Sequence, residues 1–450
     1  METLGNSISN KTVIIPRDEH IISRQNISEN ALKVLYRLKN AGYAAYLVGG
    51  AVRDLLLGLK PKDFDVATDA HPEEVNKLFR NCRLIGRRFR LAHVHFGREI
   101  IEVATFRAHH SKSTDEKVGL THDDGMILRD NVYGTLEDDA VRRDFTVNAL
   151  YYNIADFSVV DRVNGIVDLK NRVLNLIGDP ETRFTEDPVR MLRATRFAAK
   201  LQFNLPDEII TQIRNLGHRL QGVPAARLFD EMLKLFLEGH AGKNYELIVK
   251  HNLFCHLFPV AAEQLIANYN YTNTFISQAL KNTDVRIADK KPVTPAFLFA
   301  AILWSAVKME AHRLEESGMP ELQSLQLGGD IVIKRQIDTV SIPRRFQTPM
   351  REIWVMQARL MNRRGKRAFR TLDNQRFRAA YDFLLLRISS GEKTLSEFGE
   401  WWTEFQVADE SKQKEMISNV KDKNPKKRRK KRKSNKSKTS QKTNLKDSVD

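Results

Sequence analysis

One stretch, residues 46–68, constrains the fold more than any other part of the chain. Residues 46–48 form a short apolar run that ends at Gly49 and Gly50, and leucines at 55–57 follow at a spacing typical of a short helix. Paired glycines let a backbone approach a bulky group and, at a helix start, present N–H groups to an anion. The pattern therefore predicts a strand, a turn that binds phosphate, and a helix. A plain turn is the alternative, because most Gly-Gly pairs form nothing more.

Two aspartates follow in a second predicted strand of the same stretch. Side chains two positions apart on a strand point the same way, so Asp63 and Asp65 share a face while Phe64 points into the core. Two close carboxylates repel unless a cation joins them, and Mg²⁺ takes one or two carboxylates together with substrate phosphates. We expect a magnesium site here, with a solvated strand end as the alternative. A phosphate turn beside a metal pair indicates chemistry on a nucleotide.

A third carboxylate, Glu102, lies in the predicted strand 99–106 between apolar neighbours. If this strand lies beside that of Asp63 and Asp65, Glu102 faces the same surface and helps to hold two metal ions. A solvated residue on an open sheet explains Glu102 equally well.

Composition sets the broad class of the protein. A chain of 450 residues is too long for one ordinary core, and roughly two to four domains are expected. No run of about 18 apolar residues predicts a transmembrane helix, and the N-terminus does not resemble a secretory signal. Cys82 and Cys255 form neither a zinc pattern nor a disulfide framework, which fits a reducing cytoplasm.

The charge points to a polyanionic partner. The chain carries +17, and residues 421–450 supply +11 of it, with 14 Lys and Arg against three acidic residues. The rest is still basic at +6, which favours nucleic acid, with solubility, a membrane surface or a protein partner as alternatives.

The first part of the chain reads as an α/β region with helices on one side of a mixed sheet. Residues 1–25 are expected to be a mobile arm and residues 108–135 a flexible polar loop. The expected helices are 29–40, 51–57, 72–80 and 136–149, and the expected strands are 46–48, 63–68, from 84, 91–96, 99–106 and 151–161.

After a break at Gly178-Asp179-Pro180 the chain is expected to be almost all helix. The predicted helices are 186–199, 206–220, 224–239, 242–256, 273–282, 294–315, 331–340, 350–362, 366–371, 374–390 and 394–407. From about residue 412 the apolar content falls and the sequence becomes a basic tail that cannot bury enough surface to fold alone.

Two further motifs combine acids with arginines. In Arg142-Arg143-Asp144-x-x-x-Asn148, Asp144 and Asn148 share a face of the predicted helix. The functional interpretation is an arginine that contacts phosphate or sugar, with an acid beside the metal site. The alternative is a salt-bridged surface helix.

The motif Glu186-Asp187-x-x-Arg190-x-x-Arg193 brings Asp187, Arg190 and Arg193 close together on a helix. A carboxylate beside a guanidinium can read a donor amino group next to a ring-nitrogen acceptor, a pattern that adenine and cytosine share. The pair therefore explains acceptance of A and C, with an intrahelical ion pair as the alternative.

Residues 84–93 place three arginines around a phenylalanine, a pattern that can follow an RNA backbone and stack a base. A plain basic strand is the alternative. The tail is expected to bind RNA by charge rather than by sequence.

Together these motifs resemble the superfamily of class II tRNA nucleotidyltransferases and bacterial poly(A) polymerases. The residues that carry the resemblance are Gly49-Gly50-x-x-Arg53-Asp54 with Asp63-x-Asp65, Arg142-Arg143-Asp144-x-x-x-Asn148-Ala149, and Glu186-Asp187-x-x-Arg190-x-x-Arg193. Residues 84–93 are similar to the segment that separates bacterial poly(A) polymerases from CCA-adding enzymes. Beyond residue 200 the resemblance is weaker. It rests there on residues 224–230, 295–301, 365–370 and 376–382 and on the tail.

The resemblance implies a role for each matching residue. Asp63 and Asp65 would be the metal-binding catalytic pair, with Asp144 a further acidic residue of the active site. The residues implied to contact the nucleotide are Gly49, Gly50 and Arg53 at the triphosphate, Arg143 and Arg193 near the nucleotide, and Asp187 and Arg190 at the base. The implied cofactor is Mg²⁺ and the implied substrate is ATP.

The resemblance also implies an α+β architecture: an N-terminal nucleotidyltransferase palm with a mixed β-sheet, followed by a helical neck, body and C-terminal region. The expected boundaries are an arm at 1–25, the catalytic domain at 26–178, the neck at 179–260, the body at 261–411 and a disordered basic tail at 412–450.

The implied activity is template-independent addition of AMP from ATP to RNA 3′ ends, in a cytoplasmic protein with RNA-decay proteins as partners. A CCA-adding tRNA nucleotidyltransferase shares every catalytic motif and is the first alternative. The second is a nonenzymatic RNA-binding protein that retains the fold, against which intact Arg53, Asp63 and Asp65 argue.

Overall fold

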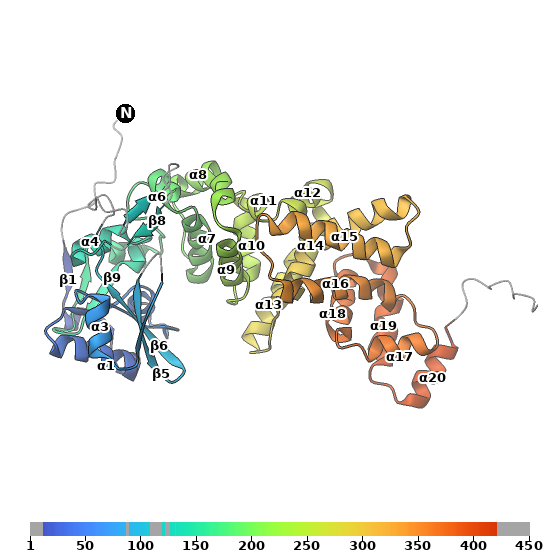
Figure 1. Ribbon diagram of the computed structural model, residues 1–450, viewed down its shortest axis with the longest axis horizontal. Coiled ribbons are helices and arrows are strands. Elements are labelled where there is room, and N and C mark those ends of the chain that lie inside the picture. Colours follow the sequence, from blue (N-terminus) through green and yellow to red (C-terminus); the bar gives the residue numbers. More distant parts are fainter. Residues whose placement is uncertain (1–11, 87–89, 109–118, 122–126, 131, 421–450) are drawn as a thin grey trace, which may run out of the picture.

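In this computed structural model, the described residues are 12–86, 90–108, 119–121, 127–130 and 132–420. Strands and short helices form a head at one end, and a run of helices extends away from it along the long axis (Figure 1). This is the predicted α+β architecture, with a mixed sheet followed by helices. None of the helices in the described ranges combines the length and apolar character needed to cross a membrane.

The strands of the described head form one large sheet and one small sheet. The eight-stranded sheet has the order β1 (Val13–Ile15), β10 (Val159–Asp161), β9 (Leu150–Asn153), β2 (Ala45–Val48), β3 (Asp65–Thr68), β6 (Glu99–Thr105), β5 (Leu91–Phe96) and β4 (Cys82–Ile85). Strands β3 and β6 run parallel, and the other neighbouring pairs run antiparallel. Strands β7 (Gly119–Thr121) and β8 (Ile127–Asp130) pair with each other.

Helices cover both faces of the large sheet. The helices of the head are α1 (Glu29–Asn40), α2 (Gly50–Leu56), α3 (Pro72–Leu78), α4 (Leu136–Arg142) and α5 (Gly165–Asn171). Neighbours along β3 point to opposite faces, so Val66 joins the main core with Leu35 of α1, whereas Ala67 joins a smaller cluster with Ala140 of α4. The expectation of helices on one side only is wrong, because α4 packs on the other face.

Helices dominate the chain from α6 onward. Their bounds are α6 (Pro180–Glu186), α7 (Val189–Leu201), α8 (Asp207–Leu216), α9 (Ala225–Phe236), α10 (Ala241–Lys250), α11 (Phe254–Leu257), α12 (Pro259–Ala267), α13 (Tyr269–Ala288), α14 (Pro295–Glu316), α15 (Glu321–Ile337), α16 (Arg344–Leu360), α17 (Lys366–Leu372), α18 (Phe377–Ser389), α19 (Ser396–Phe405) and α20 (Glu410–Ser418). The predicted break is confirmed, because the Asp179 side chain caps α6 by accepting from Thr182 N at 2.8 Å.

Several expected boundaries differ from the structure. The prediction of a mobile arm at 1–25 is wrong from residue 13, because β1 forms an edge of the sheet. The flexible loop 108–135 is wrong where β7 and β8 pair, and the rest of that prediction lies largely outside the described residues. The prediction of a disordered tail from residue 412 is wrong for α20, because its Met416 and Ile417 pack against a core. Residues 421–450 lie outside the described ranges.

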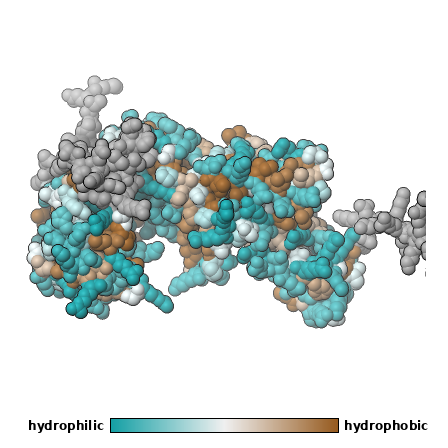
Figure 2. All heavy atoms as spheres, in the orientation of Figure 1, coloured by the Kyte–Doolittle hydropathy of each residue, from teal (hydrophilic) through white to brown (hydrophobic). Residues whose placement is uncertain are grey.

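The described residues form two large cores. One runs continuously from Ile22 in the head to Leu386 in α18, so the head and the first helices share buried contacts. A second core gathers α16 to α19, where Trp402 Nε1 donates to Leu360 O at 2.8 Å. On the face shown in Figure 2 the surface is mostly hydrophilic, with apolar side chains gathered over the middle of the helical half.

Candidate active site

Five neighbouring strands each place one residue in a single row across the sheet. The register pairs Tyr151 with Val48 and Val48 with Asp65. It also pairs Asp65 with Glu102 and Glu102 with His93. Directly paired residues share a face, so the predicted position of Glu102 on the surface of Asp65 is confirmed. The row places Asp65 and Glu102 side by side on parallel strands.

The carboxylates of this row repel one another. Burial, the charge of Glu102 and the charge of Asp63 raise the pKa of Asp65 to about 6. Asp63 precedes β3 rather than lying within it, and Phe64 packs against the core as predicted. Glu102 is exposed and lies 3.3 Å from His93 Nε2. The ionised form of the Asp65 carboxylate is unfavourable, and a bound cation would stabilise it.

Within the described residues, no group of three or more His, Cys, Asp and Glu side chains is arranged to hold a metal ion. A metal at Asp63 and Asp65 would therefore rely on ligands from a bound substrate. This is the usual arrangement for Mg²⁺, which is held by one or two carboxylates plus phosphate oxygens and water.

The glycine turn joins β2 to α2, as predicted. Gly49 has φ +74°, a conformation that favours glycine, and Gly50 is the first residue of α2. A Cβ on Gly49 would lie 3.7 Å from Arg143 Nη1, and a Cβ on Gly50 would lie 3.4 Å from Arg53 Nη2. Two guanidinium groups therefore flank the turn, which suits a site for an anion.

Arg53 is 2 % exposed and is held by protein groups. Its Nε and Nη2 donate to Asp54 Oδ1 at 2.9 and 2.6 Å, and its Nη1 donates to Asn148 Oδ1 at 2.5 Å. The guanidinium also lies over the ring of Phe197, 5.4 Å from its centroid. Arg53 thus fixes α2 to the Asn148 segment and to α7 beneath the turn.

Arg143 is clamped on one side and open on the other. Its Nε and Nη2 donate to Asp139 Oδ2 at 3.0 and 2.8 Å, and Nε also donates to the Tyr151 hydroxyl at 2.9 Å. The Asp139 charge raises the pKa of Arg143 against the effect of burial. Its positive charge in turn favours ionised Asp65. Because the clamp uses Nε and Nη2, Nη1 remains on the side of Gly49.

Positive charge is concentrated around Arg142. Burial and the charges of Arg107, Arg143, Arg183 and Arg190 lower the pKa of Arg142 to about 9. Four guanidinium groups thus act on Arg142, and one of them, Arg143, also acts on Asp65, so a positive potential lies beside the carboxylate row. Such a potential favours a polyphosphate.

Asp144 forms an ion pair with Arg193. Arg193 Nε donates to Asp144 Oδ2 at 2.8 Å, and Arg193 Nη2 contacts the same oxygen. Together with Phe145 N at 2.8 Å, this pair lowers the pKa of Asp144 to about 2 despite burial. Asn148 Nδ2 lies 3.4 Å from Oδ1, so the predicted neighbours meet. The predicted helix is wrong here, because α4 ends at Arg142 and Arg143 is extended.

The residues of the third motif separate into different pairs. Asp187 Oδ2 accepts from Arg227 Nη2 of α9 at 2.7 Å, and Arg190 Nη1 donates to Glu186 Oε2 at 2.9 Å. Pro188 ends the helix between them, so Asp187 caps α6 while Arg190 lies in α7. Arg193 lies close enough for its pKa to respond to Asp187. The predicted single cluster is therefore only partly formed.

Sequence reasoning missed the groups that hold these residues in place. Asp139 and Tyr151 orient Arg143, Glu186 pairs with Arg190, and Arg227 comes from a distant helix. The four-residue spacing of Asp139 to Arg143 on α4 was a usable signal, whereas no spacing links residue 187 to residue 227.

The basic segment 84–93 is described only at its ends, because residues 87–89 lie outside the described ranges. Arg90 Nη2 lies 2.9 Å from Glu73 Oε1, and Arg90 O accepts from Arg107 Nη2 at 3.2 Å. The predicted base stacking stays a prediction.

Three sequence models of one family match the chain in order along its length. Residues 45–175 match the model described as the Poly A polymerase head domain. Residues 202–265 match the "Probable RNA and SrmB- binding site of polymerase A", and residues 317–436 match the "Polymerase A arginine-rich C-terminus". The head match contains the whole carboxylate row.

Two bacterial relatives are similar over nearly their whole length. The chain is 50% identical to Poly(A) polymerase I of Salmonella typhimurium over 91% of this chain and 89% of the relative. It is 45% identical to Poly(A) polymerase I of Haemophilus influenzae over 92% of each. A CCA-adding enzyme of Lactobacillus helveticus is 36% identical over only 50% of this chain and 53% of that protein. CCA-adding enzymes are therefore the more distant relatives.

Among solved structures, the CCA-adding enzyme of Bacillus stearothermophilus in complex with CTP superposes with a TM-score of 0.55 at 23% identity, covering 86% of this chain and 81% of that one. At this identity the likeness shows a shared fold. With the family models and the near full-length relatives, it leads to one conclusion: the chain belongs to the poly(A) polymerase family of nucleotidyltransferases.

Proposed function

We propose that this protein is a template-independent polynucleotide adenylyltransferase, which adds AMP from ATP to RNA 3′ ends. The observation that carries the proposal is the position of the carboxylate row beside the arginine cluster at the Gly49 turn. Carboxylates suit a divalent metal and guanidinium groups suit a triphosphate, so together they suit nucleotidyl transfer. The near full-length likeness to polymerases named Poly(A) polymerase I supports adenylate as the nucleotide.

The proposal gives the site residues separate tasks. Asp63 and Asp65 would hold the metal, for which Mg²⁺ is our choice, and Gly49, Gly50 and Arg143 would line the triphosphate site. Arg53 supports the turn from below through its bonds to Asp54 and Asn148 and would contact the triphosphate by charge. The guanidinium groups beside the turn and the raised pKa of Asp65 support these assignments.

The remaining predicted residues are assigned to the nucleotide and its setting. Asp144 with Arg193 would form an acidic and basic pair beside the nucleotide, and Asp187 with Arg190 would face the base. Because their ion pairs already fix these side chains, we expect the site to be largely preformed before ATP binds.

The reaction is an in-line displacement. The 3′-hydroxyl of the RNA attacks the α-phosphorus of ATP, a new phosphodiester bond forms, and pyrophosphate leaves with the electrons of the broken bond. A divalent cation at Asp63 and Asp65 would lower the pKa of the attacking hydroxyl and neutralise the triphosphate. Arg143 and the arginine cluster stabilise the charge that develops on the departing pyrophosphate.

The proposal includes a role in RNA turnover, with RNA-decay proteins as partners, and a cytoplasmic location, where RNA and ATP occur together. For the domains we propose a palm at 26–178, a neck at 179–260 and a body at 261–411. The core shared by the head and the first helices supports a packed connection between palm and neck.

Isosteric variants test the proposed site. Incubation with ATP, a divalent cation and an RNA primer is expected to release pyrophosphate and extend the primer. Asp63→Asn and Asp65→Asn should each lower kcat by about three orders of magnitude or more, because catalysis by a metal depends on its ligands. Near wild-type extension by Asp65→Asn would refute the assignment. Absence of pyrophosphate release from the wild type would favour a nonenzymatic RNA-binding protein.

A further inference from the structure

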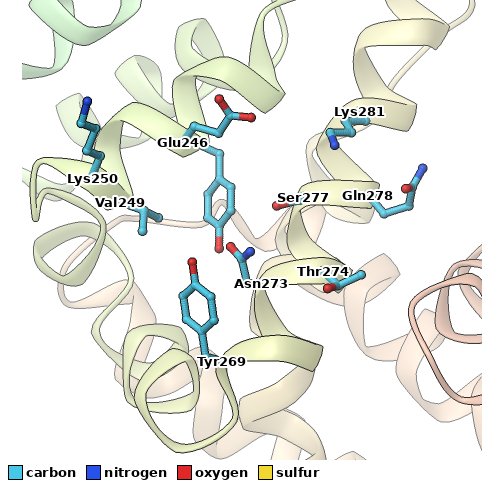
Figure 3. Close-up of a pocket in the computed structure, with 10 residues that line it drawn as sticks. Glu246, Val249, Lys250, Tyr269, Asn273, Thr274, Ser277, Gln278 and Lys281 are labelled. Atoms are coloured by element: carbon cyan, nitrogen blue, oxygen red, sulfur yellow. The ribbon is translucent and has the colours of Figure 1, made fainter.

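Helices α10 and α13 pack against each other and line an open cavity of about 480 Å³ away from the sheet. In Figure 3 the ring of Tyr269 reaches into this cavity from the start of α13, with Lys250 on one wall and Lys281 and Gln278 on the other. None of these residues belongs to the catalytic motifs.

The hydroxyl of Tyr245 indicates that this cavity has an occupant. Tyr245 lines the cavity and is 1 % exposed, and its hydroxyl has no hydrogen-bond partner among the described residues. A buried hydroxyl without a partner is costly, and native proteins rarely keep one unless something else satisfies it. A phenylalanine would fill the same space without that cost. A bound group that supplies the missing hydrogen bond explains why a tyrosine stands here.

The other lining residues define the chemistry of that group. Tyr269 is 55 % exposed and offers a ring face, while Lys250 and Lys281 offer two positive charges. Glu246 also lines the cavity, and its carboxylate pairs with Lys243 Nζ at 3.1 Å, which offsets its charge. Asn273 and Gln278 add amides that can meet the edge of a base. A stacking ring, cations for phosphate and amides for a base edge together match a nucleotide of single-stranded nucleic acid.

A second cavity, of about 750 Å³, lies on the other flank of α10 and shares Lys250 with the first. Lys243, the ring of Phe203 and the side chain of His251 also line it. His251 is 2 % exposed, and its Nδ1 has no hydrogen-bond partner among the described residues. Two basic cavities that meet at one lysine, each with a buried polar group lacking a partner, suit a polymer better than a single small molecule.

We propose that the cavity between α10 and α13 binds a nucleotide of the RNA substrate upstream of its 3′ end, and that the RNA backbone crosses α10 at Lys250. This inference rests on the proposed function, because it takes the RNA that grows at the head to continue over the helices that extend from it (Figure 1). The subsite holds RNA that has passed the catalytic centre. It contributes to the affinity for long primers and does not contribute to the chemical step.

Primer length separates this subsite from the catalytic centre. The full chain is supplied with ATP and a graded series of oligoadenylate primers, and KM for primer is measured at each length. For the wild type we expect KM to fall in a step at the length that first reaches the cavity. Tyr269→Ala and the double variant Lys250→Ala/Lys281→Ala should lose that step, which raises KM for long primers about tenfold. kcat on the shortest primers should not change.

Two further variants keep the test specific. Lys39→Ala/Lys334→Ala removes two exposed lysines that line neither cavity, and it should keep the step. Tyr245→Phe removes only the hydroxyl, so it should raise KM for long primers without lowering the melting temperature. A primer with an internal photoreactive thiouridine should crosslink to residues 269–281.

The outcomes are distinct. If the wild type has a length step that the cavity variants retain, or no step at all, the subsite is refuted, and a protein segment becomes the better occupant. If the wild type adds AMP to no primer, the proposed function itself fails.

Discussion

At the scale of the residue, packing alone does not explain the environment of Asp65. It lies in register with Glu102, and burial together with two neighbouring carboxylates raises its pKa to about 6. A protein that needed only a stable strand would place a neutral residue there. The unfavourable charge makes sense if a cation binds, because the cation reverses the sign of the local potential.

Replacing this carboxylate should therefore stabilise the metal-free protein. With chelator present, Asp65→Asn should raise the free energy of unfolding at pH 8 by on the order of 2 kcal/mol. The raised pKa means that the contribution of Asp65 to the stability of the wild type is highest below about pH 4 and is lost as the pH rises through about 6. The advantage of Asp65→Asn should thus vanish below about pH 4 in urea unfolding experiments.

Asp338→Asn, an exposed change outside the site, is the matched control and should alter stability little at any pH. Added Mg²⁺ should raise the melting temperature of the wild type and not that of Asp65→Asn. If Asp65→Asn were less stable than the wild type at pH 8 without metal, the described electrostatics of the row would be wrong.

At the scale of the element, the site depends on short segments that approach one another closely. The 3₁₀ turn Thr146–Asn148 carries the partner of Arg53, and α5 packs directly on it at Gly165. A Cβ on Gly165 would lie 2.3 Å from Thr146 O. Only glycine fits at this contact. The position of Asn148 beneath the glycine turn therefore depends on residue 165 having no Cβ.

Gly165→Ala should consequently lower the free energy of unfolding by about 2–3 kcal/mol, because the clash is with a backbone carbonyl that cannot rotate away. Chemical denaturation measures the effect. Gly242→Ala is the matched control: it lies in α10 at a negative φ with ordinary contacts, so alanine should be neutral or stabilising there. Equal stability of the two variants would show that the contact at Gly165 can relax.

The pair of Asp144 with Arg193 attaches α7 to the head. Arg193→Ala leaves a buried carboxylate without its cation and should destabilise the protein by about 3 kcal/mol. Arg214→Ala, an exposed change on α8, should cost little by comparison. Adding Asp144→Asn to Arg193→Ala should restore part of the loss in urea unfolding, since the unpaired charge disappears. A purely additive double variant would argue against a direct pair.

Elements and strand faces were more predictable than charged partners. Alternation along a strand limited Glu102 to one of two faces, and the pairing of β6 with β3 in the structure places it beside Asp65. Spacing was not enough to pair Asp187 with Arg227, since that contact depends on how α9 packs. The predicted helix over 136–149 ends at Arg142, because long-range contacts in which Arg183 Nη2 donates to Arg142 O and Arg143 O outweigh local helix propensity. The edge strand β1 is short, and its apolar residues carry little periodic signal.

At the scale of the whole molecule, charge and shape serve the same substrate. The head contains the catalytic row, the helices extend from it, and the chain carries +17 overall (Figure 1). Residues 421–450 hold +11 of this charge. A basic protein attracts a polyanion at long range, and each phosphate that it neutralises releases counterions.

Deleting residues 421–450 should accordingly weaken RNA binding and flatten its dependence on salt, because fewer phosphates are neutralised. Titrations of labelled RNA at several salt concentrations measure both effects. Extension of short primers should persist, since the catalytic row is untouched. If affinity and salt slope stay unchanged at low salt, these residues take no part in binding RNA.

The product made from ATP and CTP distinguishes poly(A) addition from CCA addition. The protein is incubated with generic RNA, or with tRNA lacking its 3′ end, and with ATP alone or ATP plus CTP. We expect a long adenylate homopolymer from ATP alone on generic RNA. Products that stop after C, C and A on tRNA, with no extension of generic RNA, would contradict this expectation and identify a CCA-adding enzyme.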